Sequence, residues 1–255
     1  MVKLGKNLGS YLGETIDIAA VLAESEQYAR KSDWTYEPVH AENGLVLPTL
    51  RREPANPRRR FYISAGIHGD EPAGPLAIRQ LLKENEWPQK TALWLCPCLN
   101  PSGFPLNRRE NADGLDLNRQ YLHLHAAETR AHIAWLKQQP NFDMTLCLHE
   151  DWEALGFYLY EINLDNRPSP AEEIIRRVEA LCPIDRSEEI EGRPASGGVV
   201  RPSPDPAGRP QWPEAFWLLT HKTRLSSTLE APSDFPLATR VAALVTAVRT
   251  VLEVV

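Results

Sequence analysis

The chain has 255 residues, 42% of them hydrophobic and 24% charged, with a formal net charge of −6. This length and composition favour one folded domain over a disordered protein, and the negative charge argues against a nucleic-acid partner. In the N-terminal segment the longest apolar run extends only from Ile18 to Ala23, and no part of the chain approaches the roughly 18 apolar residues of a membrane span. We therefore expect no signal peptide, no membrane partner and a cytoplasmic location.

The first half of the chain alternates apolar, strand-like runs with an amphipathic stretch. After an N-terminal segment of uncertain role, the expected elements are strands at 44–50 and 61–66, a helix at 72–85 and a strand at 92–99. Pro72 suits the first turn of the helix, and Leu76, Leu81 and Leu82 recur at helical spacing. The N-terminal segment covers residues 1–40, and a polar loop follows the last strand, over 100–125.

The second half continues the same alternation. We expect a helix at 126–137, strands at 143–148 and 157–162, a helix at 171–181, a long loop at 192–213, strands at 216–219 and 225–229, and a closing helix at 236–254. Strands that alternate with helices predict an α/β fold, in which helices cover both faces of a largely buried sheet. Because the chain shows no repeat and no break in composition, one domain over residues 1–255 is expected.

The sequence His68-Gly69-Asp70-Glu71 comes where a strand ends and a helix begins. Ligands of α/β sheets gather at the carboxyl ends of strands. A histidine and a glutamate three residues apart, across a tight glycine turn, can face one point, and zinc accepts both imidazole nitrogen and carboxylate oxygen. Taken alone the pattern is weak, because Asp70 and Glu71 would equally suit the positive end of the next helix.

His149 directly follows another apolar strand. By itself it is better interpreted as a satisfied core histidine. Combined with His68 and Glu71, however, it supplies a third ligand, and two histidines with one glutamate form a known catalytic zinc set that leaves a position for water.

The segment from Arg109 to Arg119 is polar and rich in turn-forming residues, as a solvated loop would be. Asn118 and Arg119 would nevertheless make a good carboxylate receptor, because a guanidinium binds a carboxylate through two parallel hydrogen bonds. Asp116 could accept a hydrogen bond from a ligand imidazole. Later in the chain, Glu230 ends an apolar strand, where a carboxylate is costly unless it is paired or functional.

Five motifs occur in one order: HGDE at 68–71, REN at 109–111, DLNR at 116–119, the strand-end His149 and LEAPS at 229–233. As an ordered set they resemble the zinc carboxypeptidase family over about residues 60–235. The resemblance implies a single-domain α/β/α sandwich around a mixed, mainly parallel sheet. It also implies one Zn²⁺ per chain, with His68, Glu71 and His149 as ligands and Asp116 supporting the first of them.

The resemblance further implies how a substrate would be handled. Arg109 matches the arginine that polarises the scissile carbonyl and stabilises its oxyanion. Asn118 and Arg119 match the pair that grips the terminal carboxylate of the substrate. Glu230 matches the general base and acid that activates the water.

The chain also departs from the family pattern. It is shorter than the family's usual domain, and residues 192–229 contain no tyrosine, although the family often supplies a mobile one there. Trp212 or His221 could occupy that region. The compact form resembles bacterial murein-peptide amidases, which cleave a γ-D-glutamyl bond to diaminopimelate, and has some likeness to the succinylglutamate desuccinylase and aspartoacylase branch.

The leading hypothesis is a zinc metallocarboxypeptidase or amidase that cleaves an amide next to a free carboxylate in a small peptide. An alternative is a deacylase of N-acyl amino acids, and a third is an inactive binding module that keeps the fold. Glu150 and Asp151, just after the third ligand, could meet an amine of the substrate. The oligomeric state is left open.

Overall fold

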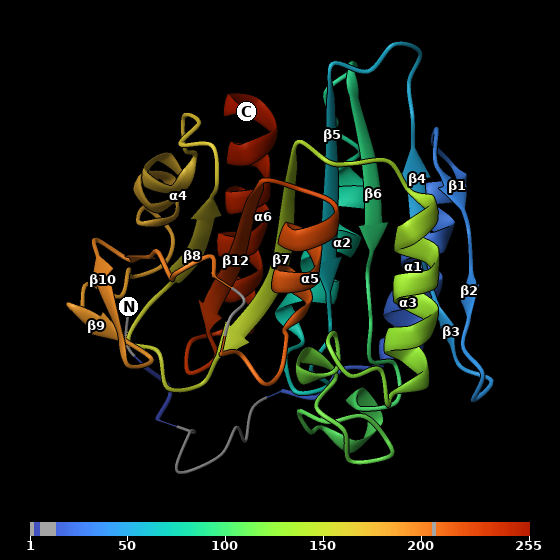
Figure 1. Cartoon of the computed structure of the whole chain (residues 1–255), viewed down its shortest axis with the longest axis horizontal. Helices are drawn as coiled ribbons and strands as arrows, with labels where there is room; N and C mark the ends of the chain where they lie inside the picture. Colours follow the sequence, from blue (N-terminus) through green and yellow to red (C-terminus); the bar gives the residue numbers. More distant parts are fainter. Residues whose placement is uncertain (1–2, 6–13, 206–207) are drawn as a thin grey trace.

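One mixed β-sheet runs through the molecule, and helices cover both of its faces (Figure 1). The computed structural model describes residues 3–5, 14–205 and 208–255. Within these ranges ten strands join in the order β1-β4-β6-β5-β7-β12-β8-β11-β10-β9, and β2 and β3 form a separate pair. Residues 1–2 and 6–13 of the expected N-terminal segment, and residues 206–207 of the expected long loop, lie outside the described part.

The strands of the large sheet are β1 Thr35–Tyr36, β4 Leu50–Arg52, β5 Arg59–Ala65, β6 Thr91–Cys96, β7 Met144–Asp151, β8 Tyr158–Asn163, β9 Glu189–Ile190, β10 Arg193–Ser196, β11 Val199–Val200 and β12 Leu225–Pro232, while β2 is Val39–His40 and β3 is Val46–Leu47. The α-helices are α1 Ile18–Arg30, α2 Ala73–Glu84, α3 Ala127–Gln138, α4 Ala171–Val178, α5 Glu214–His221 and α6 Leu237–Val254. Two short 3₁₀ turns, Phe104–Leu106 and Leu117–Arg119, lie in the loop after β6.

The centre of the sheet consists of β6, β5, β7 and β12, which run parallel to one another. Their side chains alternate between two cores, as the pleat of a strand requires. In β7, Leu146 and Leu148 belong to the core beneath α2 and α6, whereas Cys147 belongs to the core beneath α3 and α5. Figure 1 shows α5 in front of the central strands and α2 and α6 behind them. The expected α/β architecture, with a mixed sheet that is parallel at its centre, is confirmed.

Three local expectations were wrong. Residues 216–219 lie in α5 and not in a strand, because a short apolar run does not distinguish a buried helix from a buried strand. The expected loop at 192–213 contains β10 and β11. The strand expected at 44–50 is divided into β3 and the start of β4, with Pro48, which cannot donate a backbone hydrogen bond, between them.

Among the described residues, no helix combines the length and the apolar character needed to cross a bilayer. The extent of the catalytic domain, expected at residues 1–255, stays a prediction.

Candidate metal centre and its cavity

The candidate site lies at the carboxyl ends of the central parallel strands. His68 follows β5, Glu71 lies two residues before α2, and His149 lies near the end of β7. In the parallel pairing of β7 with β12, His149 stands directly beside Glu230. Neighbouring residues of paired strands point to the same face of a sheet, so the topology brings the late glutamate to the early histidines.

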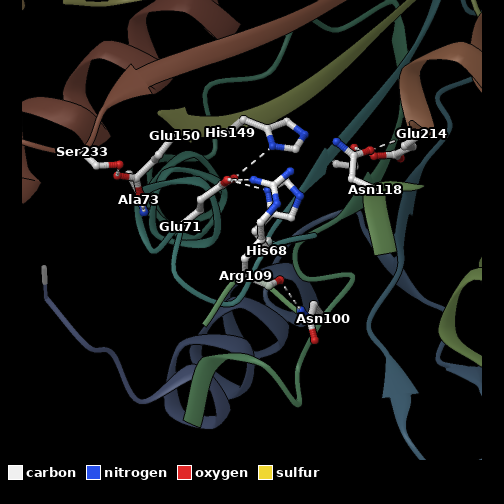
Figure 2. Close-up of polar contacts among 12 residues, drawn as sticks. His68, Glu71, Ala73, Asn100, Arg109, Asn118, His149, Glu150, Glu214 and Ser233 are labelled. Atoms are coloured by element: carbon white, nitrogen blue, oxygen red, sulfur yellow. Dashed lines mark hydrogen bonds and ion pairs between the residues drawn. The ribbon is translucent and has the colours of Figure 1, made fainter. Parts of the chain in front are cut away.

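Glu71 connects the two histidines (Figure 2). Its Oε1 lies 2.5 Å from Nδ1 of His68, and its Oε2 lies 3.0 Å from Nδ1 of His149. All three side chains are buried, and their candidate ligand atoms lie within 4.8 Å of one another. The two imidazole nitrogens and one carboxylate that converge here are a donor set that zinc accepts in catalytic sites. The residues therefore fit the metal that the motifs imply.

Asp116 and Arg109 support the first histidine from the other side. Asp116 Oδ1 lies 3.3 Å from Nε2 of His68, the ring nitrogen that faces away from Glu71. Asp116 Oδ2 accepts a 2.9 Å hydrogen bond from Nε of Arg109, whose Nη1 lies 3.9 Å from Glu71. A carboxylate behind a ligand histidine orients the ring, and Asp116 occupies that position here.

The electrostatics of the cluster follow from these contacts. Burial lowers the pKa of His68, but the carboxylates of Glu71 and Asp116 outweigh it and raise the pKa to about 9. Burial raises the pKa of Glu71, yet His68 and His149 hold it well below its usual range. The pKa of Glu230 is raised by burial and then by the charge of Glu71. The carboxylates of Glu71 and Asp116 thus favour a positive charge between His68 and His149.

Close backbone packing explains the glycine in the His-Gly-Asp-Glu turn. A Cβ on Gly69 would lie 2.2 Å from the carbonyl carbon of Gly103, which no side chain can tolerate. The loop after β6 therefore packs directly on the turn that carries His68 and Glu71, and Arg109 follows in the same loop.

A cavity of about 460 Å³ opens over the centre. Its wall includes His68, Glu71 and His149, and it also includes the other predicted residues Arg109, Asn118, Arg119, Glu150, Asp151 and Glu230. The side-chain oxygen of Asn118 accepts the backbone N–H of Glu214, which leaves the amide nitrogen as the group that can donate to a ligand. Arg119 is exposed, with its Nη1 2.9 Å from the carbonyl of Asn118. Asn118 and Arg119 thus lie together in the wall of the cavity, and their role as carboxylate receptor stays a prediction.

Glu150 and Asp151, expected to act together on a substrate amine, lie in different surroundings. The carboxylate of Glu150 points away from the two histidines, toward Ala73 and Ser233 (Figure 2), and it pairs with Arg240. The physical reason is the alternation of β7, which sends Glu150 to the α2 and α6 side together with Leu148. We therefore do not propose Glu150 as a substrate contact. Asp151 lines the cavity, where it accepts a 3.0 Å hydrogen bond from the hydroxyl of Tyr158.

The sequence did not point to several other residues of the cavity. Ser226 and Thr228 line it together with Glu230, at every second position of β12, and this period of two was the available signal. Arg193 and Arg209 also line it, each stacked on an aromatic ring, 5.8 Å from the centre of Tyr160 and 4.0 Å from the centre of Phe216.

A buried polar network supports α5 beneath the cavity. Glu214, the first residue of α5, accepts hydrogen bonds from Tyr62 at 2.8 Å and Ser64 at 2.9 Å. The Tyr62 hydroxyl also contacts Nε2 of His132, whose Nδ1 meets the hydroxyl of Tyr121. Burial raises the pKa of Glu214 to about 7. Because the backbone of Glu214 also holds Asn118, this network supports the predicted carboxylate receptor from below.

Comparison with known proteins adds a family. Residues 57–185, about half of the chain, match the model of the succinylglutamate desuccinylase/aspartoacylase catalytic domain. The chain is 32% identical over 116 residues to carboxypeptidase SOL1 of Arabidopsis thaliana and 25% identical over 164 residues to carboxypeptidase 2 of Trichophyton equinum. These alignments cover 34% and 60% of this chain but only 21% and 30% of those relatives, so the chain corresponds to less than a third of either.

Solved structures share the fold over almost the whole chain. A protein of Shewanella denitrificans OS217, proposed to be a metallopeptidase, superposes with a TM-score of 0.80 at 20% identity, over 96% of this chain and 97% of that one. The metallo-carboxypeptidase of Pseudomonas aeruginosa, solved with (2-guanidinoethylmercapto)succinic acid, gives 0.67 at 18% identity, over 91% and 67%. These likenesses concern the fold. Together with the family match they confirm the resemblance that the five motifs predicted.

Proposed function

This chain belongs to the succinylglutamate desuccinylase/aspartoacylase family, and from that premise we propose that it hydrolyses an amide bond next to a free carboxylate in a small peptide. The family and the carboxypeptidase relatives make it a metal-dependent hydrolase. In this proposal zinc is the metal, and His68, Glu71 and His149 hold it.

One observation carries the proposal. The buried cluster of two histidines and a glutamate forms part of the same cavity wall as Asn118 and Arg119. A charge-assisted, bidentate contact with arginine is a strong way to hold a carboxylate. A substrate whose carboxylate is bound there would present its neighbouring amide to the metal centre.

Each reacting group then has a partner in the chain. Zinc held by His68, Glu71 and His149 would supply Lewis acidity, which would activate water and polarise a carbonyl. Glu230, beside His149 in the sheet, takes a proton from the attacking water and returns it to the leaving amine. Arg109, oriented by Asp116, meets the negative charge that develops on the carbonyl oxygen.

The test compares metal content with activity. We expect the wild-type protein to bind one zinc per chain and to hydrolyse a carboxylate-bearing amide, and we expect His149→Ala to lose both properties. His123→Ala is the matched control, because His123 is an exposed histidine outside the cavity wall. A wild-type protein that takes up no zinc after supplementation would contradict the proposal, and a Glu230→Gln variant with unchanged turnover would contradict the role of Glu230.

A second candidate is the hydrolysis of N-acyl amino acids that carry a second carboxylate. Arg193 and Arg209 favour it, because they add two cations to the cavity wall besides Arg109 and Arg119. Each is stacked on a ring, which holds a guanidinium in place while its edge stays available to a ligand. A substrate with two acidic groups would place one at Asn118 and Arg119 and the other at Arg193 and Arg209.

Competing substrates separate the two candidates. N-acetyl-aspartate and N-succinyl-glutamate are compared with a murein tripeptide and with a neutral dipeptide at equal enzyme concentration. Preference for the acylated acidic amino acids supports the second candidate, whereas preference for the peptides supports the first.

Asp151, which lies at the cavity, remains a proposed contact for an amine of the substrate.

A further inference from the structure

We propose that Glu150 is a positioning residue, which, with Arg240 behind it, sets the spacing of the three candidate zinc ligands. The inference rests on the metal site of the proposed function. It assigns to Glu150 a role that its place after His149 in the sequence does not suggest, since its carboxylate points to the opposite face of the sheet.

The first contact joins the two elements that carry ligands. Oε1 of Glu150 accepts a 2.5 Å hydrogen bond from the backbone N–H of Ala73, the first residue of α2. The N-cap residue of this helix is Pro72, which provides no side-chain cap. A carboxylate from β7 therefore caps α2, where the helix dipole also favours negative charge. Glu71 lies two residues before this bond, and His149 lies one residue from Glu150.

The second oxygen extends the connection to the third strand. Oε2 of Glu150 lies 2.5 Å from Nη1 of Arg240 and 3.3 Å from the hydroxyl of Ser233. Ser233 directly follows β12, the strand that carries Glu230. One carboxylate thus ties together β7, the start of α2 and the turn after β12, and each of these regions contributes one group to the centre.

Arg240 makes this arrangement rigid. Its side chain is fully buried in α6, and its other terminal nitrogen, Nη2, pairs with Glu14 of the N-terminal segment. Buried ions persist only with such compensation, so neither Glu150 nor Arg240 can turn away without leaving a charge unpaired. The pair therefore holds α2 at one distance from β7.

That distance matters because Glu71 must reach both rings at once. Its two oxygens lie 2.5 Å and 3.0 Å from Nδ1 of His68 and of His149. A metal site tolerates little displacement of its ligands. A small movement of α2 along β7 would carry Glu71 away from His149, while His68 and Glu71 would move together.

The experiment measures the zinc dissociation constant by competition with a chelator. Glu150→Gln removes the charge and keeps the shape. The matched control is Glu161→Gln, because Glu161 is also buried and also pairs with an arginine and a serine, but these partners, Arg201 and Ser169, lie outside the elements that carry the candidate zinc ligands. Thermal unfolding of the zinc-free proteins reports the general cost of removing a buried carboxylate.

We expect Glu150→Gln to weaken zinc binding by about 10–100-fold, as changes behind metal ligands do, and Glu161→Gln to bind zinc like the wild type. Should the single variant fail to fold, the double variant Glu150→Gln/Arg240→Met removes both charges and must show the same weakening. Wild-type zinc affinity in a folded Glu150→Gln or double variant overturns the inference, as does equal weakening in Glu161→Gln. A wild-type protein that binds zinc but hydrolyses no amide would remove the proposed function and leave this comparison of affinities intact.

Discussion

The metal centre and the outer wall of the cavity are built in different ways. The centre uses the ends of β5, β7 and β12, the buried parallel middle of the sheet, and Glu71 connects its two histidines. The outer wall uses the β9–β10 hairpin and the segments 201–205 and 208–213, where Arg193 and Arg209 rest on aromatic rings. The proposed chemistry therefore rests on rigid neighbours in the middle of the sheet, whereas the proposed choice of substrate rests on the edge of the sheet and an exposed loop.

The largest effect is expected at the centre. Glu230→Gln removes the group that moves the proton, so kcat should fall by about 10²–10⁴-fold. Zinc content and thermal unfolding should stay close to wild type, because Glu230 is not among the candidate ligands. Steady-state kinetics and metal analysis on one preparation provide the measurement. If zinc is lost together with kcat, the separation between ligand and base is contradicted.

The next effect concerns the buried support beneath the wall. The pKa of Glu214 is raised in the folded protein from 4.5 to about 7, so the folded state holds a proton that the unfolded state has released. The contribution of Glu214 to the free energy of unfolding should therefore be greatest below pH 4.5. It should fall by up to about 3 kcal/mol as the pH rises through about 7.

Glu214→Gln should remove this slope. Urea unfolding at pH 5 and pH 8 measures it, and the wild type should lose more stability between these pH values than the variant does. Identical pH dependence in both proteins would show that Glu214 stays ionised throughout, with Tyr62 and Ser64 as sufficient donors.

The carboxylate receptor should give an intermediate effect. Arg119→Met removes a charged contact worth about 1.5–3 kcal/mol, which corresponds to a rise in KM of about 10–100-fold for substrates with a free carboxylate. The same substrates with the carboxylate converted to an amide serve as control and should lose little. An equal rise in KM for the carboxylate and amide substrates would show that Arg119 does not bind the carboxylate of the substrate.

The smallest effect is expected in the outer wall. Arg193→Met should lower kcat/KM for N-acyl acidic amino acids by about tenfold relative to neutral ones, the value of a partly exposed charged contact. Arg186→Met is the matched control, because Arg186 belongs to the same part of the chain but lies outside the cavity wall. Unchanged selectivity would favour the peptide-like substrates of the first candidate.

The sequence by itself predicted the α/β fold and the residues of the candidate centre. His68, Glu71, His149 and Glu230 all follow or end apolar strands, and the ends of parallel strands must meet at one edge of a sheet. The position of each group relative to its strand is local information, so it could be deduced before any coordinates.

Only the tertiary structure decided the rest. The direction of Glu150 follows from the pleat of β7, which sends adjacent residues to opposite faces, and its partner Arg240 lies 90 residues later in the chain. The strand expected at 216–219 is part of the helix at 214–221, because four apolar residues carry no distinguishing period. Arg193 and Arg209 reach the cavity through a hairpin and a loop, and irregular backbone has no periodicity from which a side chain's direction could be deduced.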